Sequence, residues 1–334
     1  MNLLWMFAAM AAMWVSCGTP ETEQSGRPGD GGASVSGNGG YLFVHMTDQN
    51  YGRMFYSVSR DGLVWETLND GKVILETYLG HPTLTRGGDG KYYMIGVSTG
   101  QTPHYPVLWF SDDLVVWGHR DLSPDIFDVS AFNYKNDTYY YGAPKVWYDS
   151  ASGRYIITWH AGITGVDNAQ EEWESKRTFY ILTEDFETFT PADRLFDFTG
   201  DDADMATIDT IIEKEGDTYY AIIKDERWPD KCPTGKTIRI ASSSSLTGPY
   251  TNPGPPVTPA WREAPSIVRS PDGQGWYLYT EQYPTAYELY RCSSLAGSMW
   301  SQVAFTPPVA RHGWVMRIDE TQYQAIVDAY GAGM

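Results

Sequence analysis

The sequence predicts an all-β fold, a five-bladed β-propeller, because three short elements recur along the chain in a constant order. The first element is a glycine followed shortly by an aromatic strand, and it begins at Gly39, Gly90, Gly153, Gly216 and Gly275. The second is a Ser/Thr-containing turn that ends in an aromatic residue, at 59–65, 111–117, 183–189, 244–250 and 293–300. Radial repetition of short antiparallel strands, at a spacing of roughly 50–60 residues, is typical of a propeller.

The third element is a short apolar segment that precedes an aromatic strand. Four copies begin at His81, Ala143, Ile208 and Glu263, and a fifth, at His312, has no aromatic strand after it. The missing partner is at the other end of the chain, in residues 41–47. We therefore expect the first and last strands to pair and close the ring. The alternative fold is a two-sheet sandwich in which the repeats are accidental.

The clearest copy of the unit is residues 261–283. It reads as a strand at 263–269, a Pro-Asp-Gly turn at 271–273 and a second strand at 275–280. Turn residues of this kind between two apolar or aromatic runs predict a β-hairpin. The aromatic residue that ends each second element is expected to pack between neighbouring sheets.

Composition and the N-terminus set the domain organisation. Residues 2–16 are apolar and too short to span a bilayer, and Ser16-Cys17 follows them, as in a bacterial lipoprotein signal. We expect a signal peptide at 1–17 with lipidation of Cys17, a flexible linker at 18–40 and the propeller at 41–330. The protein is then exported and anchored at the cell envelope, or otherwise periplasmic or secreted.

The net charge and the cysteines limit the possible partners. The 334-residue chain has a formal net charge of −18, which disfavours nucleic acid and anionic membrane surfaces. Contact with a membrane is therefore expected only through the lipid on Cys17, and we expect a monomer. Cys232 and Cys292 lie in different predicted blades, so two separate thiols are favoured over a disulfide.

Residues that are far apart in the sequence should meet at the mouth of the propeller. The first strand of each blade lines the axis and starts at one common mouth, which brings together His81, the 141–145 stretch, Asp209, Glu263 and His312. Two carboxylates and two imidazoles at one mouth favour a ligand site over a random surface.

Each of the two carboxylates also has a purely structural interpretation. Asp209 stands in an apolar strand, where burying an unpaired carboxylate costs free energy. In the structural interpretation it caps a turn or pairs with an arginine. Glu263 could form a salt bridge with Arg262 or Arg311. In apolar and aromatic surroundings, however, the pKa of a Glu is raised, as a general acid for glycosidic cleavage requires.

At these residues the sequence resembles glycoside hydrolase family 43 and its relatives, the five-bladed arabinosidases and xylosidases, from about Tyr41 to Tyr323. The resemblance implies that Glu263, in Glu-Ala-Pro-Ser-Ile, is the general acid. It also implies that Asp209 orients this acid and tunes its pKa. Arg311-His312-Gly resembles the last-blade motif, whose His lies near the pocket floor, sometimes beside a metal.

The sequence departs from this family at two positions. The motif aspartate that serves as general base is replaced by His81, and the glutamate of the second-blade motif is replaced by Lys145. We expect His81 to be catalytic together with Glu263 and Asp209. The expected substrate-binding residues are His312, Arg311, His160, Lys145, Asp225, Arg262 and His45. No cofactor is expected, except a possible Ca or Na ion near His312.

Three functions remain open from the sequence. The first is an inverting, exo-acting glycoside hydrolase on plant or algal poly- or oligosaccharide, with His81 in the place of the base. The second is lyase-type elimination from an acidic sugar, in which a histidine removes a proton and Arg262, Arg311 or Lys145 neutralises the carboxylate. The third is a non-catalytic propeller that binds glycans. A carbohydrate is the expected partner in all three.

Overall fold

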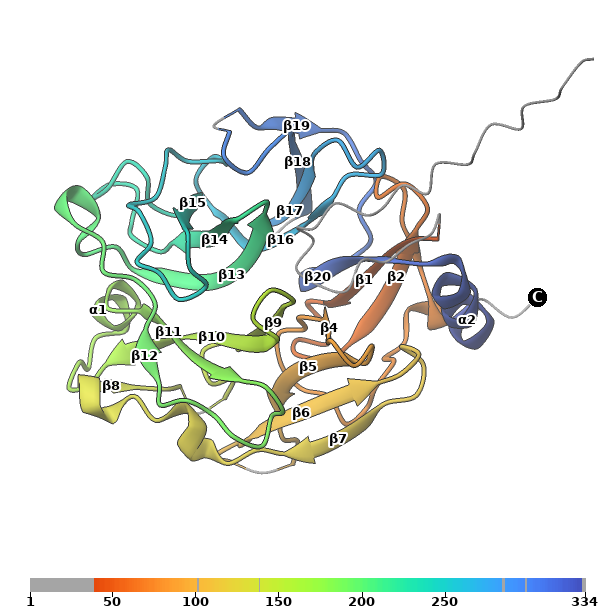
Figure 1. Cartoon of the computed structure of the whole chain (residues 1–334), viewed down its shortest axis with the longest axis horizontal. Coiled ribbons are helices and arrows are strands. Elements are labelled where there is room, and N and C mark those ends of the chain that lie inside the picture. The colour runs from red at the N-terminus through yellow and green to blue at the C-terminus, as the bar shows by residue number, and fades with distance from the viewer. Residues whose placement is uncertain (1–38, 101, 138, 284–285, 298, 332–334) are drawn as a thin grey trace, which may run out of the picture.

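The computed structural model describes residues 39–331 except 101, 138, 284, 285 and 298, and these residues form five antiparallel sheets in a ring around a central axis (Figure 1). The predicted five-bladed propeller is therefore confirmed. The strands β4, β9, β13, β16 and β20 lie nearest the axis, and their neighbours in each sheet lie progressively farther out (Figure 1).

One sheet contains strands from both ends of the described chain. Its order is β20 (Arg311–Ile318), β1 (Gly40–Met46), β2 (Phe55–Ser59) and β3 (Glu66–Thr67). In the antiparallel pairing of β1 with β20, Tyr41 faces Arg317 and Val44 faces Trp314. The predicted closure of the ring by residues 41–47 is thus confirmed.

The other four sheets follow in chain order. The next contains β4 (Thr85–Arg86), β5 (Tyr92–Val97), β6 (Pro106–Ser111) and β7 (Gly118–Asp121). It is followed by β8 (Tyr134–Lys135), β9 (Lys145–Asp149), β10 (Arg154–Ile163), β11 (Arg177–Thr183) and β12 (Asp193–Arg194). Then come β13 (Thr207–Glu215), β14 (Thr218–Asp225) and β15 (Ile238–Ser243). The last contains β16 (Arg262–Arg269), β17 (Trp276–Gln282), β18 (Ala286–Cys292) and β19 (Ser301–Val303).

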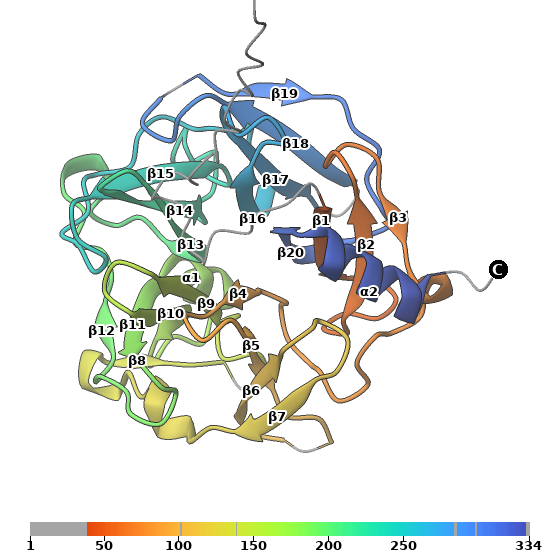
Figure 2. The same ribbon diagram turned by 45° about the vertical axis from the view of Figure 1, so that its right-hand side comes forward.

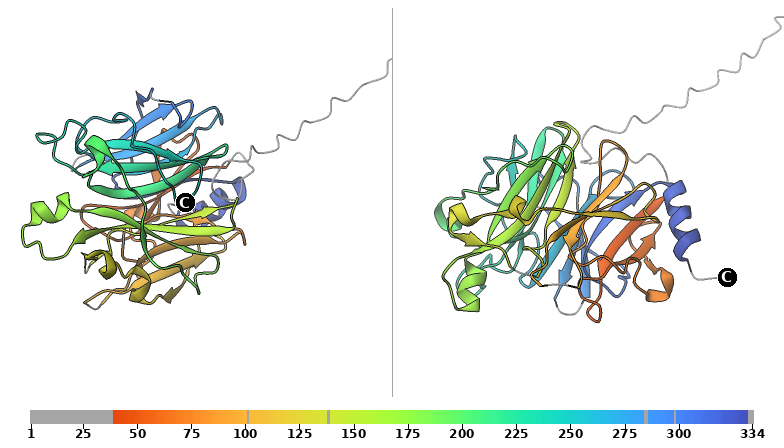
Figure 3. Two further views of the ribbon diagram at one scale, coloured as in Figure 1. Left: turned by 60° about the vertical axis from the view of Figure 1, so that its left-hand side comes forward. Right: turned by 90° about the horizontal axis from the view of Figure 1, so that it is seen from below.

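The structure also contains helices, which the sequence-based prediction did not include. Helix α1 (Ala169–Glu174) precedes β11, and α2 (Glu320–Tyr330) follows β20 on the outside of the ring (Figures 2 and 3). A capping box formed by Asp319 and Gln322 starts α2. Short 3₁₀ helices lie at Asn69–Gly71, Pro124–Phe127, Ser130–Phe132 and Gly200–Asp202.

The recurring Ser/Thr turn has a hydrogen-bonding cause. The Ser59 hydroxyl accepts a hydrogen bond from the Gly62 amide at 2.8 Å, and an Asp61 carboxylate oxygen accepts one from the Leu63 amide at 2.8 Å. Ser111 and Asp113 bind the following amides in the same way. A hydroxyl and a carboxylate two residues apart therefore satisfy the amides of the tight turn between two strands.

The hydrophobic core lies mainly between adjacent sheets. Trp65, which ends the first copy of the recurring turn, packs against Phe43 of β1 and Tyr279 of β17, with ring centroids 5.5 and 5.9 Å apart. This confirms, for Trp65, that the aromatic residue after the turn packs between neighbouring sheets. The arrangement fixes the rotation of one sheet against the next, and so the position of the inner strands at the axis.

The predicted signal peptide and most of the predicted linker lie outside the described residues, so the structure does not test them. Where the chain is described, no helix is long and apolar enough to cross a bilayer. Cys232 and Cys292 are both free, in agreement with the interpretation as two separate thiols.

Candidate active site

Asp209 and Glu263 both occupy β-bulges on inner strands. The pairing of β13 with β14 shifts register between Ile208 and Ile211, and that of β16 with β17 shifts between Glu263 and Ser266. The backbone also takes a positive φ here, +48° at Asp209 and +49° at Ala264. Because a bulge bends its strand and redirects a side chain, both carboxylates leave the regular alternation of the strand.

The two bulges are connected directly. The Ala264 amide donates a hydrogen bond to Asp209 Oδ2 at 3.2 Å, so the backbone beside Glu263 holds Asp209. Burial raises the pKa of Asp209, but the charges of His312, Lys145, His160 and His81 outweigh burial and lower it far below its usual range. Asp209 is therefore a buried carboxylate in a positive environment, and it also accepts a hydrogen bond from a backbone amide.

Glu263 is held between two cationic groups. Lys224 Nζ lies 2.8 Å from its Oε2, and His312 Nε2 lies 3.2 Å from its Oε1. Burial raises the pKa of Glu263, but the hydrogen bond to His312 and the charge of Lys224 lower it to about 2. The expectation of a raised pKa is therefore wrong for this site without substrate, because Lys224 and His312 replace the apolar surroundings that it assumed.

The same glutamate does not form the salt bridges that the sequence offered as alternatives. Arg262 binds both carboxylate oxygens of Glu288, at 2.8 and 2.7 Å. Arg311 pairs with Glu281 and Asp48. Both guanidinium groups are thus paired elsewhere, and neither residue lines the pocket described below, so their contact with substrate stays a prediction.

His81 and His312 lie side by side, with ring centroids 4.5 Å apart. Neither ring nitrogen of His81, nor Nδ1 of His312, has a hydrogen-bond partner among the described residues. Burial and the nearby charges of His312 and Lys145 lower the pKa of His81 well below its usual value. Burial lowers the pKa of His312 too, but its hydrogen bond to Glu263 and the charge of Asp209 raise it above 6.5 overall.

These groups lie at a pocket of about 580 Å³, within the size range of small-molecule sites. Five of the ten predicted site residues line it: Glu263, Asp209, His81, His312 and His160. Burial, as the largest cause, lowers the pKa of His160 to about 4. The pocket therefore brings together the two predicted carboxylates and three of the predicted imidazoles.

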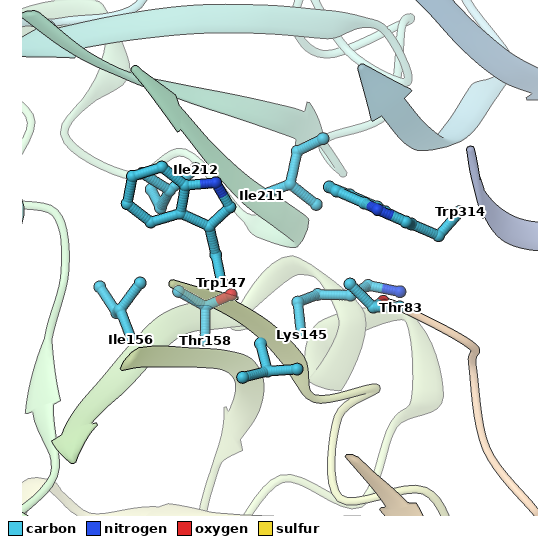
Figure 4. A pocket seen from close by; sticks show the side chains of 9 residues that line it. Thr83, Lys145, Trp147, Ile156, Thr158, Ile211, Ile212 and Trp314 are labelled. Carbon is cyan, nitrogen blue, oxygen red and sulfur yellow. The ribbon is translucent and has the colours of Figure 1, made fainter. Parts of the chain in front are cut away.

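Lys145 lies beside this pocket rather than on its wall. It lines a separate cavity of about 10 Å³ with Thr83, Trp147 and Trp314, which has room for about one water molecule (Figure 4). Burial lowers the pKa of Lys145, while the charge of Asp209 acts in the opposite direction. The structure therefore shows an electrostatic interaction of Lys145 with Asp209, and its contact with substrate stays a prediction.

Asp225 and His45 are also away from the pocket. The carboxylate of Asp225 is fully buried and binds the guanidinium groups of Arg227 and Arg239. His45 is fully buried as well, and its ring contacts Ser57 Oγ at 2.9 Å. Both side chains are therefore paired inside the protein and away from the pocket, and their contact with substrate stays a prediction without support from the geometry.

Sequence reasoning missed a chain of alternating charges behind Glu263. Lys224 also lies 2.9 Å from Glu226 Oε2, and Glu226 pairs further with Lys236. The alternation of β14 continued by one residue would have found them, since Lys224 and Glu226 are two positions apart and Asp225 lies between them on the other face. The other missed lining residues come from loops and α1: Tyr51, Asp137, Tyr139, Tyr140, Glu172, Trp173, Lys176 and Tyr283.

Two groups of side chains could hold a metal ion. One ligand atom each from His81, Asp209 and His312 lies within 4.8 Å of the others, and the same is true of Glu263, Glu281 and His312. The first group offers two nitrogens and one carboxylate, which suit zinc or another transition metal better than the oxygen-preferring Ca²⁺. The expected Ca or Na ion near His312 therefore fits the second group better.

Comparison with known proteins identifies relatives of the whole propeller. A family model described as "Probable glycosyl hydrolase domain", and related to family 43, matches residues 38–324. No curated protein sequence matches the chain.

Among solved structures, a thermostable family-43 glycoside hydrolase has 14% identity, a TM-score of 0.53, and coverage of 84% of this chain and 95% of its own. An α-L-arabinanase from Cellvibrio cellulosa, in complex with arabinohexaose, has 14% identity, a TM-score of 0.50, and coverage of 77% and 90%. An exo-β-1,3-galactanase from Phanerochaete chrysosporium has 15% identity and a TM-score of 0.45; the match covers 67% of this chain and 49% of that one, about half its length. At these identities the first two structures show a shared fold.

Proposed function

This chain belongs to the glycosyl hydrolase 43-related family, and we propose that it is an inverting, exo-acting glycoside hydrolase on plant or algal poly- or oligosaccharides. The observation that carries the proposal is the connection between two catalytic carboxylates. Asp209 and Glu263 line one pocket from adjacent blades, and the amide next to Glu263 holds Asp209. In this proposal a terminal sugar occupies the pocket, Glu263 is the general acid and Asp209 positions it.

The acid must deliver a proton although its own pKa is low. His312, whose pKa is raised, contacts Glu263 at 3.2 Å, so the two groups share one proton that belongs to the pair. A sugar in the pocket excludes water and weakens the charged form of Glu263. The proton then passes from His312 through Glu263 to the glycosidic oxygen as its bond to the anomeric carbon breaks.

His81 is the proposed base. Neither ring nitrogen has a partner among the described residues, and its lowered pKa keeps the imidazole neutral, so the nitrogen without a hydrogen can accept a proton. Water attacks the anomeric carbon from the face opposite the leaving oxygen and gives its proton to His81. Inversion requires a separation of roughly 6.5–9.5 Å between acid and base, to leave room for this water.

The other two functions have less support. Elimination from an acidic sugar needs free cations near the substrate carboxylate. Arg262 and Arg311 are each paired with glutamates, and Lys145 lies in a separate cavity beside the pocket. A non-catalytic glycan-binding module needs no pair of buried carboxylates beneath a pocket.

Export and lipid attachment at Cys17 stay part of the proposal, and mass spectrometry of the membrane fraction tests them.

The test measures release of monosaccharide from arabino-, xylo- and galacto-oligosaccharides. We expect Glu263→Gln to lower kcat by about 10²- to 10⁴-fold and to leave oligosaccharide binding intact. Asp272→Asn, a matched carboxyl-to-amide change in the turn after β16, should have no effect. NMR of the first-formed anomer decides between inversion and retention. If wild-type protein releases no sugar from any of these substrates, the proposal is wrong.

A further inference from the structure

A row of three aromatic side chains leads away from the pocket. Tyr283 lines the pocket, its ring centroid is 5.9 Å from that of Trp261, and Trp261 is 5.6 Å from Trp228. We call these three residues the aromatic row. Trp261, in the middle, keeps 39% of its surface exposed. The row is therefore continuous with the pocket, and its middle ring is accessible from solvent.

Exposed aromatic residues are concentrated at this one place. Four large aromatic side chains are exposed in the described part of the chain: Tyr51, Tyr139, Trp173 and Trp261. The first three line the pocket, and Trp261 contacts Tyr283, which also lines it. Exposed rings that are scattered singly need no explanation, but rings gathered around one pocket indicate a binding surface.

The aromatic row begins on the side of the pocket where Glu263 lies. The Tyr283 ring is 4.9 Å from Lys224 Nζ, which is itself 2.8 Å from Glu263 Oε2. Trp261 precedes Glu263 by two residues in the chain. A general acid protonates the oxygen that joins the cleaved sugar to its leaving group, so the leaving group must lie beside the acid.

The backbone holds Trp261 in an unfavourable conformation. Its φ is +68°, which is rare for a bulky residue and is maintained only where the surroundings enforce it, often at functional sites. Arg262 provides this restraint: its guanidinium donates to the Ala260 carbonyl at 2.7 Å and binds Glu288, and its amide donates to the Lys236 carbonyl at 3.0 Å. Arg262 is thus a positioning residue for Trp261.

We propose that the aromatic row binds the leaving-group sugars, so that the substrate is a chain with at least two sugar units beyond the cleaved bond. This inference rests on the proposed function, because it uses Glu263 as the general acid. Sugar rings present C–H faces that stack on Tyr and Trp. Each stacked ring is expected to raise kcat/KM by about three- to tenfold.

The experiment compares kcat/KM for di-, tri- and tetrasaccharides of one linkage in wild type, Trp261→Ala, Trp261→Tyr and Trp173→Ala. In wild type we expect kcat/KM to rise with length. Trp261→Ala should remove about three- to tenfold of this rise, and Trp261→Tyr should restore most of it. Trp173→Ala, the control at the pocket itself, should lower kcat/KM for all lengths by one common factor.

A binding measurement separates failure of this inference from failure of the proposed function. The same oligosaccharides are titrated calorimetrically into Glu263→Gln protein with and without Trp261→Ala. If affinity rises with oligosaccharide length and the double variant loses this rise, the aromatic row is supported as a sugar-binding site, even if no hydrolysis occurs. The inference is overturned if hydrolysis or binding by the wild type does not depend on oligosaccharide length. It is also overturned if Trp261→Ala leaves the length dependence unchanged.

Discussion

Replacing Lys224 by methionine tests the proposed acid most directly. Lys224 is fully buried, and its ammonium is shared between Glu263 and Glu226 at 2.8 and 2.9 Å. Methionine keeps most of the side-chain volume and removes the charge. Lys236→Met is the matched control, because Lys236 also pairs with Glu226 but forms no direct bond with Glu263.

The size of the effect follows from the pKa of Glu263. Lowering this pKa from 4.5 to about 2, against the opposing effect of burial, corresponds to about 3 kcal/mol in favour of the carboxylate. His312 and Lys224 are the two main sources. If Lys224 supplies about half of this lowering, its removal raises the apparent pKa of the Glu263–His312 pair by about one to two units.

The assay is the pH dependence of kcat/KM on a cleaved oligosaccharide. Activity requires a proton on the Glu263–His312 pair, so it is lost as pH rises through the raised pKa of that pair. Without the positive charge of Lys224 the pair keeps its proton to higher pH. The alkaline limb should therefore move up by about one to two pH units in Lys224→Met. It should move clearly less in Lys236→Met, whose ammonium acts on Glu263 without a direct bond.

Stability provides the control for folding. Each variant leaves a buried glutamate with one cation fewer, so each should lose about 3–5 kcal/mol of unfolding free energy. Comparable thermal unfolding with different pH profiles would show that the shift comes from contact with Glu263. If Lys224→Met is folded and its alkaline limb coincides with that of wild type, Glu263 is not the acid that titrates.

Three further predictions follow from other buried groups. His81→Gln should lower kcat by about 10²- to 10⁴-fold, whereas His81→Asp should retain measurable turnover; equal activity of His81→Gln and wild type contradicts the base role. Asp225→Asn should lower the free energy of unfolding, measured with urea, by about 3–5 kcal/mol, because Arg227 and Arg239 lose their buried partner. KM should stay unchanged, and a raised KM would show that Asp225 does contribute to substrate binding. The pKa of His45 is lowered by burial to about 4, so the unfolded chain takes up a proton at higher pH than the folded one. Its contribution of about 3 kcal/mol is present above pH 6.5 and lost as pH falls to 4, so His45→Gln should flatten this part of the pH–stability curve.

The sequence by itself determined the ring and the chain positions that meet at its mouth. Both depend on local regularities: turn hydroxyls and carboxylates such as Ser59 and Asp61, a Gly-aromatic strand in each blade, and a last strand that lacks its partner. Such signals are short in range and recur, so they can be read without coordinates. Asp209, Glu263 and His312 were found in this way, since each stands at the start of an inner strand.

The tertiary structure decided the charge environment and the function of the neighbouring side chains. The sequence gives no distance between Lys224 and Glu263, 39 residues apart, so the lowered pKa of Glu263 could not be predicted. The sequence likewise could not show that Arg262 forms an ion pair with Glu288, or that Asp225 forms one with Arg227. The physical reason is that a pKa depends on charges a few ångströms away in space, and these come from segments whose approach only the folded chain establishes.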